Sequence, residues 1–157
     1  MLSDFLGAIW RRVPGKLRRW TMRLSHPRFA VTAGAVITDN QGRVLLLKHR
    51  FRPGIGWGMP GGFLQEGEQP DQALRRELRE EVGLEVEKLE LLITRAFKVS
   101  RQVEIVFTAR AIGDTNQLNY EIQKAGWFYL NELPRELPKD QAQIIKRALN
   151  DGASLQD

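Results

Sequence analysis

Hydrophobic positions recur with a helical period most clearly in residues 71–82. Charged side chains fill the positions between them, so the pattern is typical of a helix with one buried face. Pro70 and Asp71 suit the start of a helix, and Gly83 suits the first position after its end. The pattern therefore predicts a helix over 71–82. Its buried positions are expected to be Ala73, Leu74, Leu78 and Val82.

Strand-like runs rich in β-branched residues lie on both sides of this helix. Residues 29–49 are predicted to form a β-hairpin, because two such runs flank a turn at 39–42. A glycine-rich loop follows at 49–62. Further strands are expected at about 86–97, 102–112 and 126–129, and a last helix at about 139–149. Its candidate packing positions are Ala142, Ile145, Ala148 and Leu149. The mixed order of strands and helices favours an α/β (α+β) sandwich.

Length and composition limit the chain to one domain with a sizeable core. It has 157 residues, of which 42% are hydrophobic and 27% are charged. We expect a helical arm at 1–28, the domain at 29–149 and a flexible C-terminal tail at 150–157. The chain contains no cysteine, which excludes disulfides, thiolate metal sites and a cysteine nucleophile.

The charge of the chain is concentrated in the arm. Residues 1–28 hold seven basic residues against one acid, a balance of +6. The remaining 129 residues hold 17 basic residues against 18 acids, a balance of −1. This distribution does not describe a uniform nucleic-acid-binding surface, so no nucleic-acid partner is expected.

The arm itself resembles two short amphipathic helices broken near 14–15, with an apolar stripe that includes Trp10, Leu17 and Trp20. The interpretation we favour is packing on protein, either on the domain or on a second subunit in a homodimer. The alternatives are a membrane surface, with arginines facing lipid phosphates, and nucleic acid. Charges interrupt every apolar run of the arm, and no run of the chain approaches the roughly 18 apolar residues of a membrane span. We therefore expect a cytoplasmic protein, with membrane-peripheral placement as the alternative.

Three acids of the predicted helix fall on one face. Glu77, Glu80 and Glu81 stand at positions i, i+3 and i+4, where like charges repel by a few tenths of a kcal/mol per pair. A solvated helix face balanced by nearby arginines is one interpretation. The other is a divalent cation site, because Mg²⁺ binds several oxygen ligands and the loop at 49–62 allows backbone to approach a ligand closely. Spacing alone leaves both interpretations open.

A fixed spacing of residues connects the loop to the helix. Its positions are Gly62, Glu68, Arg76, Glu77, Leu78, Glu80, Glu81, Gly83 and Leu84. In this order and spacing they resemble the Nudix box, and every defined position of that pattern is matched across 23 residues. The domain at about 29–149 is therefore identified as a member of the Nudix hydrolase family. The resemblance implies a Nudix-like α/β/α sandwich with a mixed β-sheet, to which the arm is an addition.

The resemblance also implies a function. Nudix hydrolases cleave the diphosphate linkage of a nucleoside diphosphate derivative, a small-molecule substrate, with Mg²⁺ or alternatively Mn²⁺ as cofactor. By the family pattern, Glu80 and Glu81 are metal ligands beside the carbonyl of Gly62. Glu77 is a ligand or the catalytic group that orients or deprotonates water. Arg76 has the role of holding these carboxylates in place by pairing.

Outside the box the assignments have ordinary alternatives. Glu121 lies six residues before Trp127, where several family members place a further metal ligand, but it is equally an exposed acid. Glu68 either assists from the start of the helix or is solvated. The candidates for substrate binding are His49, Arg50, Arg52 and Trp57. The three basic residues would contact phosphates. Trp57 would stack on a nucleobase, or pack against the domain.

The substrate cannot be read from the box. The chain has no proline between Pro70 and Pro134 and no tyrosine in the domain before Tyr120, which lowers the ADP-ribose and dinucleoside-polyphosphate interpretations. The longer signatures of the NADH and coenzyme A subfamilies are missing too. Nucleoside triphosphates and nucleotide-linked sugars or alcohols stay open. A catalytically idle Nudix-fold binding or regulatory module is the rival interpretation, and the complete acidic set favours an enzyme.

Overall fold

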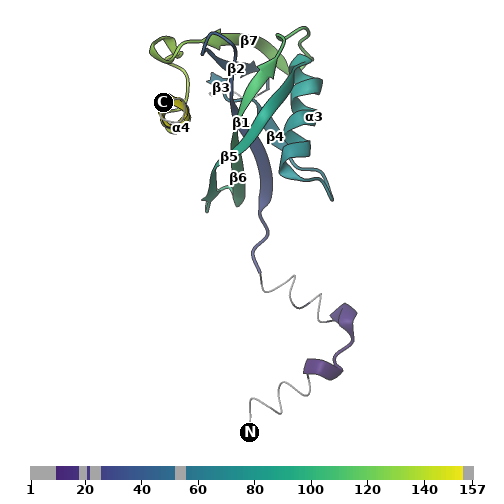
Figure 1. Cartoon of the computed structure of the whole chain (residues 1–157). Coiled ribbons are helices and arrows are strands. Elements are labelled where there is room, and N and C mark those ends of the chain that lie inside the picture. The colour runs from purple at the N-terminus through teal and green to yellow at the C-terminus, as the bar shows by residue number, and fades with distance from the viewer. Residues whose placement is uncertain (1–9, 18–20, 22–25, 52–55, 154–157) are drawn as a thin grey trace.

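The computed structural model describes residues 10–17, 21, 26–51 and 56–153 (Figure 1). Within these residues the chain forms one seven-stranded sheet and two long helices. The strands are β1 (Ala30–Thr38), β2 (Val44–His49), β3 (Trp57–Gly58), β4 (Gly61–Phe63), β5 (Glu85–Phe97), β6 (Gln102–Ile112) and β7 (Ile122–Phe128). The helices are α3 (Pro70–Val82) and α4 (Lys139–Ala153), with a short 3₁₀ turn at Leu130–Glu132.

The predicted elements are present, with three differences in extent. The loop at 49–62 contains the two short strands β3 and β4, which pattern analysis missed because each spans three residues or fewer. Strand β7 begins at Ile122 rather than at 126, and α4 continues to Ala153. The division of the chain into arm, domain and tail stays a prediction.

Strand β1 is the centre of the sheet. It runs parallel to β6 from the pair Ala30↔Gln102 to the pair Thr38↔Arg110, and antiparallel to β4. Its predicted hairpin with β2 is confirmed. The two strands pair next to the turn, with Thr38↔Val44 as the register pair, and then separate. Strand β2 instead pairs with β3 and β7, and β5 pairs with β6. Because one pair is parallel and the others are antiparallel, the predicted mixed sheet is confirmed.

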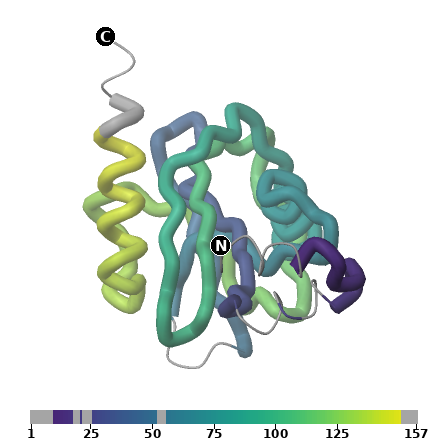
Figure 2. The backbone as a smooth tube through the Cα atoms, turned by 90° about the horizontal axis from the view of Figure 1, so that it is seen from below, coloured from purple at the N-terminus to yellow at the C-terminus, as the bar shows by residue number. Residues whose placement is uncertain are grey.

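The two helices cover opposite faces of the sheet, as Figure 2 shows, with α4 on one side and α3 on the other. Successive side chains of β2 point to opposite faces of the sheet. Leu45 and Leu47 pack in the core under α3, and Leu46 packs in the core under α4. Complete burial of one such leucine is worth about 1.5–3 kcal/mol. The predicted stripe of α3 (Ala73, Leu74, Leu78 and Val82) is fully buried. In α4 the prediction omitted Ile144, which is also buried.

The ends of α3 are fixed by local chemistry. Its first residue is Pro70, and the Gln72 side chain accepts a hydrogen bond from the backbone N–H of Gln69 at 3.2 Å. At the other end Gly83 has φ +65°, and a Cβ there would lie 2.0 Å from Asn116 Oδ1. The left-handed backbone conformation favours glycine at this position, so the helix ends at a fixed residue.

The described residues of the arm are 10–17, 21 and 26–28. Trp10 and Leu17 expose 42% and 49% of their surface. Trp20 and residues 1–9 lie outside the described residues, so much of the predicted apolar stripe does too. No helix in the part of the chain that the structure describes is long and apolar enough to cross a membrane.

Candidate active site

The acidic face of α3 lies against the glycine loop at Gly62. Strand β4 places Gly62 opposite Ala33 of β1, at the edge of the sheet nearest the helix. A Cβ on Gly62 would lie 2.3 Å from both Cδ and Oε1 of Glu77. The missing side chain of Gly62 is therefore what lets the Glu77 carboxylate rest against the loop backbone.

Arg76 connects the acids to one another. Its Nη1 donates to Glu77 Oε1 at 2.9 Å and to Glu80 Oε2 at 3.3 Å. Its Nε donates to Glu68 Oε1 at 2.9 Å, and its Nη2 donates to the carbonyl of Phe63 at 3.1 Å. The pairing expected of Arg76 is thus present, and it offsets the repulsion between neighbouring carboxylates. Its part in catalysis stays a prediction.

These contacts change the proton affinity of both partners. The hydrogen bond with Glu68 is the largest effect on Arg76 and raises the pKa of its guanidinium, although burial alone would lower it. In turn, the hydrogen bond from Arg76, followed by that from the Gln65 backbone, lowers the pKa of Glu68. Glu68 is therefore a charged partner of Arg76 rather than a solvated acid.

Glu81 differs from its two neighbours because it is buried, with 4% of its surface exposed. Its Oε1 lies 4.0 Å from Nδ1 of His49, which ends β2 and is also buried. Glu80 in contrast exposes 57% of its side chain. The structure thus places His49, which sequence reasoning had grouped with the phosphate-binding residues, beside the innermost acid.

The donor set fits a hard divalent cation in its chemistry. It consists of carboxylate oxygens and backbone carbonyl, the ligands that Mg²⁺ prefers. The Gly62 cradle supplies the space that brings Glu77 to the loop. A buried carboxylate such as Glu81 is costly unless cations or donors surround it, which is the demand that a bound metal meets. Among the described residues, no group of three His, Asp or Glu side chains already converges on one point, and Arg76 holds two of the three acids.

Glu121 belongs to a loop that is tied to the end of α3. The backbone N–H of Asn119 donates to the carbonyl of Glu81 at 3.0 Å, and Asn119 Oδ1 accepts from the N–H of Glu121 at 2.9 Å. The N–H of Arg50 donates to the carbonyl of Glu121 at 2.7 Å. The Glu121 side chain is exposed, and its carboxylate accepts a hydrogen bond from the Tyr120 hydroxyl, which raises the pKa of Tyr120. Glu121 is thus near the acidic face, and its role as a ligand stays a prediction.

The remaining substrate-binding candidates have different surroundings. Arg50 donates from Nε to the carbonyl of Tyr120 at 3.0 Å, which ties β2 to the Glu121 loop. Trp57 packs edge-on against Phe128, with ring centroids 5.0 Å apart. Arg52 lies outside the described residues. The structure therefore brings His49 beside Glu81 and Arg50 beside the Glu121 loop, while Trp57 packs with the core under α4.

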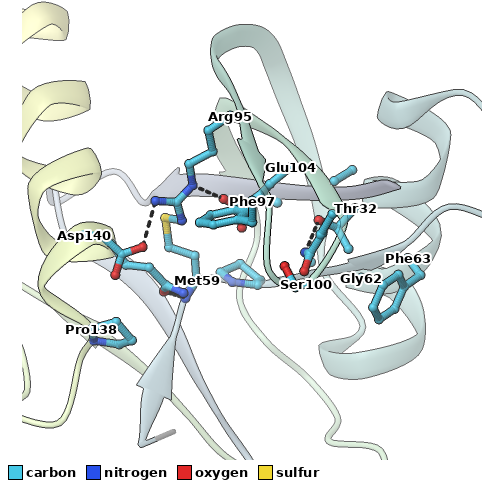
Figure 3. A pocket seen from close by; sticks show the side chains of 16 residues that line it. Thr32, Met59, Gly62, Phe63, Arg95, Phe97, Ser100, Glu104, Pro138 and Asp140 are labelled. Carbon is cyan, nitrogen blue, oxygen red and sulfur yellow. Dashed lines mark hydrogen bonds and ion pairs between the residues drawn. The ribbon is translucent and has the colours of Figure 1, made fainter. Parts of the chain in front are cut away.

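A cavity of about 440 Å³ adjoins this site, and sequence reasoning missed it. Figure 3 shows it between the sheet and the start of α4. Gly62 and Phe63 form the wall nearest the acids, and Arg95, Glu104 and Asp140 supply charged side chains farther in. The pairing of Arg95 with Glu104 could have been read from the β5–β6 hairpin, where the two residues are register partners.

Comparison with known proteins gives one consistent result. The NUDIX domain family model matches residues 28–148. An ADP-ribose pyrophosphatase of Methanocaldococcus jannaschii is 34% identical over 136 residues, which are 83% of this chain and 77% of that protein. A NAD-capped RNA hydrolase NudC of Pseudomonas aeruginosa is 32% identical over 110 residues. That match covers 69% of this chain but 39% of NudC, so the chain spans about two fifths of this relative's length.

Solved structures agree on the fold. A crystal structure of a MutT NUDIX hydrolase from Burkholderia pseudomallei is 29% identical with a TM-score of 0.67, covering 76% of this chain and 97% of that one. A NUDIX hydrolase from Nitrosomonas europaea is 25% identical with a TM-score of 0.71, covering 80% of this chain and 73% of that one.

Proposed function

The chain belongs to the Nudix hydrolase family, and we propose that α3 is its metal-binding and catalytic element. The protein is a pyrophosphohydrolase that acts on the diphosphate linkage of a nucleoside diphosphate derivative with the help of a divalent metal. The identity of the metal, the roles of single residues and the substrate are proposals.

Glu80 and Glu81 are the proposed metal ligands, with the carbonyl of Gly62 and the carboxylate of Glu77 beside them. Mg²⁺ is the proposed ion, because it binds oxygen ligands and usually shares its site with substrate phosphates. When bound, such an ion neutralises phosphoryl charge and lowers the pKa of a bound water. Glu121, on the loop tied to the Glu81 turn, is proposed as a further ligand.

Three further residues have proposed roles beside the metal ligands. Arg76 holds Glu77 and Glu80 by hydrogen bonds of 2.9 and 3.3 Å, so both carboxylates are oriented before substrate arrives. Glu77 is proposed to orient the attacking water or to accept its proton. His49, buried against Glu81, is proposed to hold that carboxylate in position rather than to bind phosphate.

One observation carries this proposal: Gly62 borders both the acidic face of α3 and the neighbouring cavity. The Glu77 carboxylate lies where a Cβ on Gly62 would be, and the same glycine lines the cavity of about 440 Å³. A substrate with its nucleoside in the cavity would therefore place its diphosphate over Gly62, next to the acids. This arrangement suits cleavage of the linkage rather than storage of a nucleotide.

The names of the relatives define the substrates to compare. One relative is named an ADP-ribose pyrophosphatase and others are named NAD-capped RNA hydrolase, RNA pyrophosphohydrolase and 8-oxo-dGTP diphosphatase. All are proposals for this chain. The relative from Methanocaldococcus jannaschii returns ADP-ribose to the set, although the absence of a proline between Pro70 and Pro134 had lowered that interpretation.

The experiment is a substrate panel with and without metal. Purified protein is incubated with ADP-ribose, NAD, 8-oxo-dGTP and a nucleoside diphosphate sugar, and products are identified by chromatography with added phosphatase as reporter. We expect cleavage within the diphosphate of at least one compound, dependent on Mg²⁺ and abolished by a chelator. Nucleotide binding without cleavage of any compound would instead identify a catalytically idle module.

The arm is a separate proposal. Trp10 and Leu17 remain about half exposed on the described chain, so their apolar surface is available to a second molecule. We propose a second copy of the chain as that partner, in a cytoplasmic protein. A membrane surface that attracts the basic residues is the alternative.

A further inference from the structure

The cavity contains one charged cluster, made by three elements. Arg95 of β5 donates from Nε to Glu104 of β6, and its Nη1 donates to Asp140 Oδ2 in the first turn of α4 at 2.7 Å. Figure 3 shows Arg95 between the two acids, close to Phe97. The Arg95 guanidinium lies 4.8 Å from the centre of the Phe97 ring. The cluster is therefore held from several directions.

The charge of this cluster is negative. Among the described residues that line the cavity, Arg95, Glu104 and Asp140 are the charged ones, which sets one cation against two carboxylates. Arg95 exposes 20% of its side chain and Glu104 exposes 16%, so solvent screens this part of the cluster weakly. The single cation is already neutralised by its two partners. An incoming anion would therefore meet a net charge of −1 from these three described side chains.

The effect on a ligand depends on its charge. A phosphate or carboxylate placed in the cavity is repelled by the excess carboxylate, whereas an uncharged ring with N–H groups finds carboxylate acceptors. We infer that the Arg95–Glu104–Asp140 cluster selects nucleoside diphosphate derivatives whose nucleoside end is uncharged and rejects those with a further phosphate on that nucleoside. This inference rests on the proposed function, because it assumes that the nucleoside occupies the cavity.

A structural role for the cluster makes a different prediction. The contact between Arg95 and Asp140 also ties α4 to the β5–β6 hairpin, so its loss could simply loosen the cavity. A loosened cavity weakens binding of charged and uncharged nucleosides alike and lowers the melting temperature. Selection by charge changes the ratio between the two ligands. The ratio of affinities is therefore the informative quantity.

The test compares matched ligands by calorimetry in the presence of Mg²⁺. The probes are AMP, GMP, CMP and UMP, each against its 2′,5′- and 3′,5′-bisphosphates, none of which contains a diphosphate linkage to cleave. For the best-bound base we expect the monophosphate to bind roughly three- to tenfold more tightly than its bisphosphates, the range for one partly exposed unit charge. Asp140→Asn, at an exposed position, should remove most of that ratio, and Glu104→Gln should act in the same direction.

The control is Glu90→Gln, which removes the same charge from an exposed acid of β5 outside the cavity and should leave the ratio unchanged. A ratio near one in the unaltered protein, or a ratio that Asp140→Asn and Glu104→Gln leave intact, would overturn the inference. Hydrolysis of the substrate panel without this preference would leave the proposed function standing. A preference without hydrolysis would contradict the proposed function alone, and no binding by any nucleotide would overturn the inference.

Discussion

Replacing Gly62 by alanine perturbs the site by one methyl group. The backbone tolerates the change, because Gly62 does not belong to the glycines with positive φ. The added Cβ would lie 2.3 Å from Cδ and Oε1 of Glu77 and 2.8 Å from Oε2. The Glu77 carboxylate must therefore leave its place against the loop, and its hydrogen bond with Arg76 must stretch or break.

The size of the effect differs between stability and activity. Restoring an ordinary contact requires Glu77 to move by about 1 Å, since carbon and oxygen atoms in contact lie about 3.4–4 Å apart. A new alanine gains about 0.4–1 kcal/mol from the unfolded state, and the disturbed Arg76–Glu77 pair loses up to about 1 kcal/mol. The free energy of unfolding should thus change little. A displacement of about 1 Å in a catalytic group costs about 10²-fold in rate.

Two measurements on the same preparation separate these effects. Initial rates on the best substrate of the panel, across Mg²⁺ concentrations, give turnover and metal dependence, and urea unfolding gives stability. Gly58→Ala is the matched control, because its new Cβ would lie 3.5 Å from Gln141 Oε1, an ordinary contact. We expect Gly58→Ala to keep its turnover and Gly62→Ala to lose about two orders of magnitude.

The reasoning fails under either of two results. Normal turnover in Gly62→Ala would show that the position of Glu77 against the loop does not matter to the chemistry. An equal loss in Gly62→Ala and Gly58→Ala would show that glycine is needed at both positions for a reason unrelated to Glu77.

Three further predictions concern other parts of the molecule. Glu121→Ala should lower turnover or weaken metal dependence more than Glu87→Ala or Glu90→Ala, measured as rate against Mg²⁺; equal and negligible effects at all three would make Glu121 a surface acid. A chain beginning at Arg28 should keep its turnover but lose solubility, stability or its oligomeric state; salt-sensitive sedimentation of the full chain, but not the truncated one, with anionic vesicles would favour a membrane surface instead. Trp127 donates from Nε1 to Asp114 at 2.7 Å, and this hydrogen bond is the largest effect lowering the pKa of Asp114 below 3.8. A lowered pKa stabilises the fold above pH 3.8, and the benefit is lost as pH falls through the folded-state value. As pH falls below 3.8, Trp127→Phe should therefore lose less unfolding free energy than the unaltered protein does. The same slope of unfolding free energy against pH in both proteins would contradict this role of the Trp127–Asp114 hydrogen bond.

Local features of this chain could be predicted from its sequence. The helix expected at 71–82 is observed as Pro70–Val82, because its period, its proline start and its glycine end act within a few residues. The acidic face follows from the same period. Burial of Glu81 does not, because it depends on β2 and on the loop that donates from Asn119. A helix pattern alone gives no reason to separate Glu81 from the exposed Glu80.

Features that depend on distant pairing could not be predicted. Strand β7 starts at Ile122 because Ile122, Lys124 and Ala125 pair with β2, although Gln123 and Lys124 interrupt its apolar pattern. The cavity cluster joins Arg95 to Asp140, which is 45 residues away in the sequence. The hydrophobic pattern of one segment does not identify its distant partner, because such contacts follow from how strands and helices are ordered in the sheet. Under the proposed function, the substrate class depends on this part of the molecule.

The most direct measurement of the central claim is a Mg²⁺ titration of Glu81→Gln on the best substrate of the panel. Glutamine keeps the shape of the buried side chain and removes its charge, and Glu90→Gln serves as the control for charge. We predict that Glu81→Gln folds with equal or higher thermal stability, since repulsion on α3 is relieved, and that its turnover falls by orders of magnitude. Near-normal turnover of Glu81→Gln at limiting Mg²⁺ would contradict the assignment of α3 as the metal-binding element.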